Sequence, residues 1–142
     1  MKPSVVTSAP LPDLLHVARD TTPGVHRTDS DDAVVWWLPV LGPTAIVLAF
    51  TLARYTPNEG ATWDTRVLAQ RIGLAGNLFT LRDSLNRLDR FGAAKFHAVD
   101  VLTIRLWLPA LTERRLARLP DDMADEYRRM LDMGADRLVV AS

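Results

Sequence analysis

An uncharged run of 21 residues, AVVWWLPVLGPTAIVLAFTLA at positions 33–53, constrains the fold of this 142-residue chain more than any other feature. Such a run either crosses a membrane, which takes about 20 apolar residues, or lies in a protein core. Pro39, Gly42 and Pro43 interrupt it, and we interpret them as a break between two buried elements. We predict a short Val- and Trp-rich strand, a turn, and a core helix from Pro43 to about Tyr55, because proline fits the first turn of a helix. We expect no membrane partner, although proline is tolerated in lipid and a membrane span is therefore the alternative.

Composition narrows the function classes. Apolar residues make up 48% of the chain and charged residues 24%, as in a globular protein of one domain. The absence of cysteine excludes disulfides, cysteine-based zinc sites and a cysteine nucleophile. His16, His26 and His97 lack metal-ligand spacing, so we expect surface or loop histidines and no metal. No Ser-hydrolase, Walker or HExxH motif and no Gly-rich phosphate loop occurs, so we expect neither an enzyme nor a cofactor.

The net charge is zero, but the charges are unevenly distributed. Residues 58–118 hold ten basic and six acidic side chains, residues 1–57 hold four and five, and residues 119–142 hold three and six. Of the 17 basic residues 15 are Arg, which favours bidentate contacts with phosphate or guanine. A GC-rich genome gives the same arginine bias without functional meaning, and both explanations stay open.

Helical periodicity defines the middle of the chain. Asp64 or Thr65 is suited to cap a helix that runs to Ile72, and Gly73 supplies the turn. After the turn, Asn77 is an N-cap candidate for a helix that ends near Gly92. Leucines at 78, 81, 85 and 88 form the apolar stripe of this helix.

A period of two replaces the helical period after residue 94. The sequence LTIRLWL alternates between apolar and polar positions and predicts a half-buried strand, with AKFHA as its hairpin partner. Two helices follow, broken by Pro120, and Gly134 is expected to end the second. The predicted fold is mainly α with a small β-hairpin.

We predict three parts along the chain. Residues 1–32, rich in Pro, Ser, Thr and Asp, form a flexible N-terminal arm with one short amphipathic candidate, LPDLLHVARD. Residues 33–118 form the main domain, and residues 119–142 form a C-terminal helix that is a candidate dimerisation element. The start of the chain lacks the pattern of a signal peptide, and we expect a cytoplasmic location.

Residues 61 to 108 resemble the winged helix-turn-helix superfamily. The resemblance rests on the small Ala69, on Gly73 in the turn, on Ile72 and Leu74 beside it, and on the leucine stripe of the second helix. The turn LAGN is about two residues longer than the tightest helix-turn-helix spacing, as in winged variants, and leaves the DNA-facing register open. The whole chain is also similar to small actinobacterial winged-helix proteins. The resemblance implies a winged helix-turn-helix with extra N- and C-terminal elements.

The resemblance also implies candidate DNA contacts, because the second helix would lie in the major groove. We expect Arg82 and Asn86 to contact guanine and adenine edges. Phosphate contacts are expected from the remaining polar residues of the helix: Asn77, Thr80, Arg87 and Arg90. Hairpin contacts with the backbone or minor groove are expected from Lys95, His97 and Arg105. In the alternative interpretation, Asp83 and Asp89 pair with Arg87 and Arg90 as solvated surface ion pairs.

These residues predict a sequence-specific DNA-binding transcriptional regulator located at the nucleoid, with double-stranded DNA as its partner. Trp36 and Trp37 would face opposite sides of the predicted strand, with one available to a second subunit. The same homodimer interface is expected from apolar residues near the C-terminus: Leu116, Leu119, Met123, Tyr127, Met130, Leu131 and Leu138. In the alternative, these residues pack on their own domain. A winged-helix protein-interaction module with a protein partner is the second functional hypothesis, because the net charge is zero and the polar helix carries acids.

Overall fold

The computed structural model describes residues 10–141, and side chains up to residue 134. Six helices and six strands are present in this part of the chain, so the fold is mixed α/β rather than mainly α as predicted. The chain divides into two compact units, the first ending at Ala110 and the second starting at Leu111, not at the predicted boundary after residue 118. None of the helices within residues 10–141 has the length and hydrophobicity that a membrane crossing requires.

A four-stranded sheet forms one layer of the first unit. Its order is β3 (Ala61–Asp64), β1 (Leu14–Asp20), β5 (Val101–Arg105) and β4 (Ala94–Ala98). Strand β1 is antiparallel to β3 and parallel to β5, while β4 and β5 form the predicted hairpin. The predicted strand LTIRLWL is too long, because β5 ends at Arg105 and the last two residues of that sequence belong to the second sheet. A separate two-stranded sheet pairs β2 (His26–Arg27) with β6 (Trp107–Leu108).

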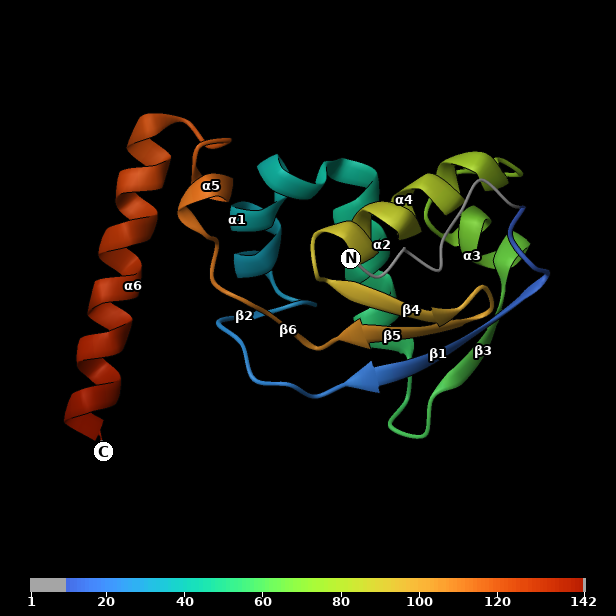
Figure 1. Cartoon of the computed structure of the whole chain (residues 1–142), viewed down its shortest axis with the longest axis horizontal. Helices are drawn as coiled ribbons and strands as arrows, with labels where there is room; N and C mark the ends of the chain where they lie inside the picture. The colour runs from blue at the N-terminus through green and yellow to red at the C-terminus, as the bar shows by residue number, and fades with distance from the viewer. Residues whose placement is uncertain (1–9, 142) are drawn as a thin grey trace. The chain divides into compact units, whose positions relative to one another are not determined.

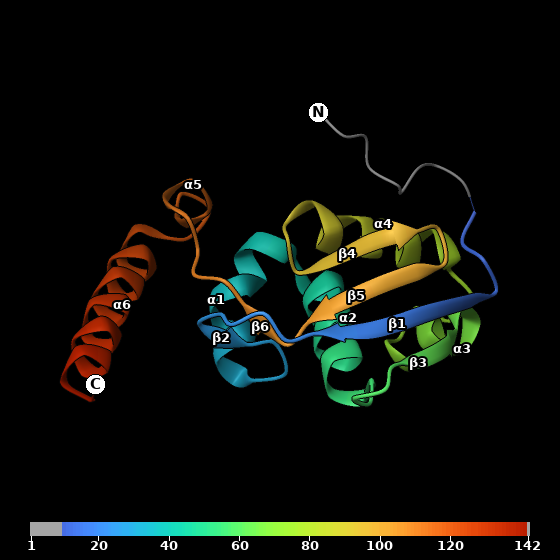
Figure 2. The same ribbon diagram turned by 60° about the horizontal axis from the view of Figure 1, so that its bottom comes forward.

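Three helices cover one face of the large sheet: α2 (Pro43–Tyr55), α3 (Thr65–Arg71) and α4 (Leu78–Arg90) (Figures 1 and 2). Helix α1 (Asp31–Leu41) packs against α2 and the small sheet. Alternation along the strands matches this arrangement. In β1, Leu15 and Val17 are buried under the helices, whereas Leu14 and His16 are exposed on the other face. The first unit is therefore a two-layer structure with an open sheet face.

The prediction of a flexible arm over residues 1–32 is wrong for Leu14–Asp20, which form the central strand β1. Residues 1–9 lie outside the described part of the chain. The segment LLHVARD alternates as a half-buried strand does, but its partners β3 and β5 are about 40 and 80 positions away. Short-range patterns in the sequence therefore did not reveal it.

The predicted strand before Pro39 is wrong as well, because these residues form the helix α1. The Ser30 hydroxyl accepts a hydrogen bond from the N–H of Ala33 at 3.2 Å and caps the helix. Trp36 and Trp37 are both buried, so neither is left for a partner as the strand interpretation required. Helix α2 begins at Pro43 and ends at Tyr55, as predicted.

The two helices of the predicted helix-turn-helix are confirmed as α3 and α4. Asn77 caps α4, because its side-chain oxygen accepts a hydrogen bond from the Thr80 N–H at 3.1 Å. Gly73 has φ +83°, a backbone conformation that side chains with a Cβ resist. The turn between the helices is thus built by the residues that indicated it.

The second unit contains α5 (Glu113–Leu116) and α6 (Asp121–Ala141). Gly134 does not end α6 as predicted, since an interior glycine costs a helix only about 1 kcal/mol. Leu116, Leu119 and Tyr127 are buried within a single copy of the chain, and the Tyr127 hydroxyl accepts a hydrogen bond from the Leu111 N–H at 2.8 Å. These three residues are therefore not free for the predicted dimer interface. Of the other predicted interface residues, Met123, Met130 and Leu131 are half-buried, and the Leu138 side chain lies outside the described part.

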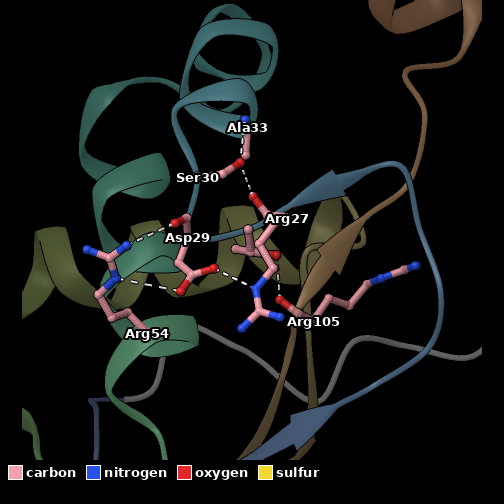
Figure 3. A network of polar contacts seen from close by, with 7 residues as sticks. Arg27, Asp29, Ser30, Ala33, Arg54 and Arg105 are labelled. Carbon is pink, nitrogen blue, oxygen red and sulfur yellow. Dashed lines mark hydrogen bonds and ion pairs between the residues drawn. The ribbon is translucent and has the colours of Figure 1, made fainter. Parts of the chain in front are cut away.

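A polar network around Asp29 fixes the approach to α1 (Figure 3). The Asp29 carboxylate accepts a hydrogen bond from Arg27 Nε at 2.7 Å and pairs with Arg54 Nε at 3.6 Å. The Ser30 hydroxyl donates to the Arg27 carbonyl at 2.6 Å, and Thr28 donates to the Arg105 carbonyl at 2.6 Å. The network thus joins the start of α1 to both sheets and to the end of α2.

We expect Asp29→Asn to destabilise the protein by about 1 kcal/mol at pH 7, with the difference from wild type disappearing in acid. Burial alone would raise the pKa of Asp29, but the hydrogen bond and charge of Arg27, with the charge of Arg54, hold that pKa below its ordinary value. A carboxylate with a lowered pKa stabilises the fold above its unfolded pKa of about 3.9 and loses this contribution as pH falls through the lower folded pKa. Urea unfolding at pH 7 and at pH values below about 4 measures both effects. The exposed Asp13→Asn serves as the control, and an equal loss at every pH would contradict the prediction.

Candidate functional site

Helix α4 is amphipathic, with one buried side and one exposed side. Leu81, Leu85 and Leu88 are fully buried, as their spacing predicts. Leu78 is only half-buried, and Ser84, at 6% exposure, lies on the buried side instead. On the opposite side, Phe79 is 72% exposed, the Asp83 side chain is 70% exposed, and Arg90 is exposed.

The Arg87 side chain is hydrogen-bonded to the backbone of helix α1. Its Nε donates to the Leu41 carbonyl at 2.6 Å, and its Nη2 donates to the Val40 carbonyl at 2.8 Å. These carbonyls lie at the C-terminal end of α1, where backbone acceptors lack helical partners and positive charge is favourable. Arg87 therefore joins α4 to the end of α1, a role that the sequence prediction of a phosphate contact did not include.

The two predicted base-reading residues are more covered than expected. The Arg82 side chain is 15% exposed, pairs with Asp83 at 3.3 Å, and lies over the Phe79 ring with a 5.1 Å distance to its centroid. Asn86 is half-buried, and its Oδ1 has no hydrogen-bond partner within the described residues. To contact a base, Arg82 would have to break its ion pair with Asp83 and bind the base edge instead.

The acids of α4 do not form the ion pairs considered from the sequence. Asp83 pairs with Arg82 rather than with Arg87. Asp89 accepts a hydrogen bond from the Phe96 N–H at 2.8 Å. This N–H lies on the outer edge of β4, so Asp89 satisfies a donor that an edge strand would otherwise expose.

The hairpin residues are placed on the open face of the sheet, away from α4. Lys95 and His97 are exposed there, alternating with buried Ala94 and Phe96, and His97 Nε2 is 3.0 Å from Thr103 Oγ1. A strand alternates its side chains between faces, so these two residues cannot join the polar side of α4 in one surface. The structure therefore separates the hairpin candidates from the helix candidates.

Arg105 also makes hydrogen bonds within the fold. Its Nε donates to the Trp107 carbonyl at 2.8 Å and its Nη2 donates to the Pro23 carbonyl at 3.0 Å. These bonds hold the segment between β1 and β2 against β6. Two of its three guanidinium nitrogens are thereby occupied, and the predicted backbone contact with DNA would have to use the third.

The histidines do not converge. His16 and His97 are exposed on the sheet, whereas His26 is fully buried, with Nδ1 2.5 Å from Asp32 Oδ2, so the expectation of a surface or loop position is wrong for His26. Within the described residues, no group of three or more histidine and acidic side chains is arranged to hold a metal ion.

A cleft of about 430 Å³ lies between α4 and the connection from α1 to α2. One wall is formed by residues 41–45, and the other wall by polar residues of α4: Thr80, Asp83, Ser84, Asn86, Arg87 and Arg90. The cleft brings together four of the predicted residues, Thr80, Asn86, Arg87 and Arg90. Thr44 and Ser84 were missed, because Thr44 lies 40 positions before Ser84 in the chain and the pattern of α4 gives serine no special place.

Comparison of the chain with protein-family models, curated proteins and solved structures found no match.

Proposed function

We propose that this protein is a winged helix-turn-helix DNA-binding regulator that places α4 in the major groove of double-stranded DNA. The observation that carries the proposal is the exposed side of α4, the second helix of a strand–helix–turn–helix–hairpin unit, β3–α3–α4–β4–β5. Arg90 is exposed there, and no ion pair or hydrogen bond within residues 10–134 engages its side chain. A helix of this kind reads base edges while flanking cations contact phosphates.

We assign the candidate residues to two kinds of DNA contact. Arg82 and Asn86 are the proposed base contacts, and Arg90 and Thr80 are the proposed phosphate contacts. Asn77 is exposed at the positive end of the α4 dipole, where a phosphate is favoured. Lys95 and His97 lie on the open sheet face, and any DNA contact proposed for them is separate from the major-groove contact of α4.

We propose that the protein acts as a homodimer, because symmetric regulators of this kind bind two half-sites about one helical turn apart. The apolar residues left for such an interface are on α6, where Met133 is 57% exposed and Met123 and Met130 are half-buried. The proposed location is the nucleoid, which follows from the proposed partner.

A protein-interaction module is the second candidate, and two side chains favour it. Phe79, exposed at the start of α4, lines a small, mostly apolar pocket of about 190 Å³ together with Pro10, Leu11, Leu78 and Arg82. The exposed Asp83 carboxylate would repel phosphates on the same side of the helix. Aromatic anchors that pack in pockets are typical of protein–protein interfaces.

Fluorescence anisotropy against labelled genomic fragments distinguishes the two candidates. A regulator prefers particular fragments, and its affinity falls as salt rises from about 50 to about 200 mM. We expect the double variant Arg82→Ala/Asn86→Ala to lower affinity for the preferred fragment by about tenfold to a hundredfold, with little effect on other fragments.

Arg129→Ala, which removes an exposed arginine from α6, is the matched control and should bind DNA as wild type does. Circular dichroism should show that both proteins remain folded. Equal, weak binding of every fragment at low salt would contradict the regulator and favour the interaction module.

A further inference from the structure

The cleft beside α4 contains polar groups whose partners are missing. Ser84 is 6% exposed and lines the cleft, yet its hydroxyl makes no hydrogen bond within the part of the chain that the structure describes. The Asn86 Oδ1 is buried and likewise has no partner there. Buried polar groups in folded proteins are nearly always hydrogen-bonded. A hydrogen-bond acceptor that enters the cleft would give the Ser84 hydroxyl a partner.

The charged side chains that line the cleft favour an anionic ligand. Arg90 brings a guanidinium without a partner among the described residues, and Arg87 has Nη1 left after Nε and Nη2 bind the end of α1. The one acid in the lining, Asp83, is paired with Arg82 at 3.3 Å. The lining is therefore net positive.

The opposite wall adds donors of the same kind. Helix α2 begins there at Pro43, its N-cap is Gly42, and no side chain caps it. The first N–H groups after Pro43 belong to Thr44 and Ala45, which line the cleft at the positive end of the helix dipole. Thr44 and Thr80, which both carry hydroxyls, line the same cleft. Two hydroxyl-bearing walls, two arginines and an uncapped helix start are thus arranged around one cavity.

We infer that this cleft binds a phosphate group. Hydroxyls, guanidinium groups and backbone N–H groups are donors from which phosphate oxygens accept hydrogen bonds. The phosphate is either that of a DNA backbone or that of a free phosphorylated small molecule. Only the first source rests on the proposed function.

Titration of the full chain with pyrophosphate and with inorganic phosphate, followed by ¹H–¹⁵N NMR, tests the inference. We expect saturable shifts of the Thr44, Ala45 and Ser84 amides, which sodium chloride at the same ionic strength does not produce. Arg90→Gln should weaken pyrophosphate binding about tenfold or more, because it removes a charge-assisted hydrogen bond. Thr44→Val, which removes only a hydroxyl, should weaken it a few-fold, and the exposed Arg129→Gln should leave it unchanged.

Duplex DNA provides the second arm of the experiment. Weaker DNA binding by Arg90→Gln, together with competition between pyrophosphate and duplex, assigns the cleft to a backbone phosphate. Pyrophosphate binding without any DNA binding supports a free phosphorylated ligand, in which case the inference stands and the proposed function fails. Absence of saturable shifts with both anions at several millimolar overturns the inference, whether or not the protein binds DNA.

Discussion

Replacing Leu15 with Ala should lower the free energy of unfolding by about 3 kcal/mol, the middle of the range for a fully buried leucine. Leu15 is 0% exposed and lies on the central strand β1, opposite Trp63 of β3. Its truncation leaves a cavity between the sheet and the helices that cover it, and neighbouring strands on both sides limit collapse of the backbone into that space. Urea unfolding followed by tryptophan fluorescence measures the loss.

The neighbouring leucine is the matched control for this prediction. Leu14 is 50% exposed on the open face of the same strand, and Leu14→Ala should change stability by less than about 0.5 kcal/mol. The two variants remove the same atoms from adjacent positions. Equal and small effects would mean that β1 is not a structural strand and that residues 14–20 belong to a flexible arm after all.

The second large effect is expected at Arg87. Arg87→Ala removes two charge-assisted hydrogen bonds to the Leu41 and Val40 carbonyls and leaves both acceptors half-buried without partners. We expect a loss of about 2–4 kcal/mol, because a hydrogen bond to a charged group contributes about 1.5–3 kcal/mol and the two bonds act together. Arg87→Lys should recover only part of it, since an ammonium cannot donate in the planar fork of a guanidinium. Thermal and urea unfolding measure these differences.

Arg90, one helical turn after Arg87, is the control. Arg90→Ala should leave the free energy of unfolding within about 0.5 kcal/mol of wild type, because the Arg90 side chain is exposed. Arg90→Ala is thereby expected to affect ligand binding without affecting stability. A similar loss of stability in both variants would contradict the assignment of Arg87 to the end of α1.

Local sequence patterns determined the elements of the middle of the chain. The leucine spacing of 81, 85 and 88 defines the buried side of α4, Asn77 caps it, Gly73 makes the turn, and the alternation after residue 100 predicts the β4–β5 hairpin. These features depend on neighbours within a few residues, where helix and strand periods, capping and glycine conformations act. The start of α2 at Pro43 belongs to the same group.

Local sequence patterns were misleading where contacts with other segments of the chain determine the secondary structure. The run AVVWW has the β-branched and aromatic residues of a strand, but Ser30 caps it as a helix and burial of both Trp36 and Trp37 needs helical spacing. The alternation in LLHVARD is a strand pattern without a neighbouring partner in the sequence. It becomes a central strand only because β3 and β5, far along the chain, offer backbone hydrogen bonds on both sides.

The sequence alone determined which polar residues α4 carries, since helical periodicity fixes the side of the helix on which each one stands. The interactions of these residues depend on how the chain folds around them. The tertiary structure directs Arg87 to the end of α1, Asp89 to the edge of β4 and Lys95 to the opposite sheet face, and it brings Thr44 beside Ser84 and Arg90. The physical reason is that hydrogen bonds and ion pairs act over a few ångströms in space, and the packing of distant segments sets which groups come within that distance.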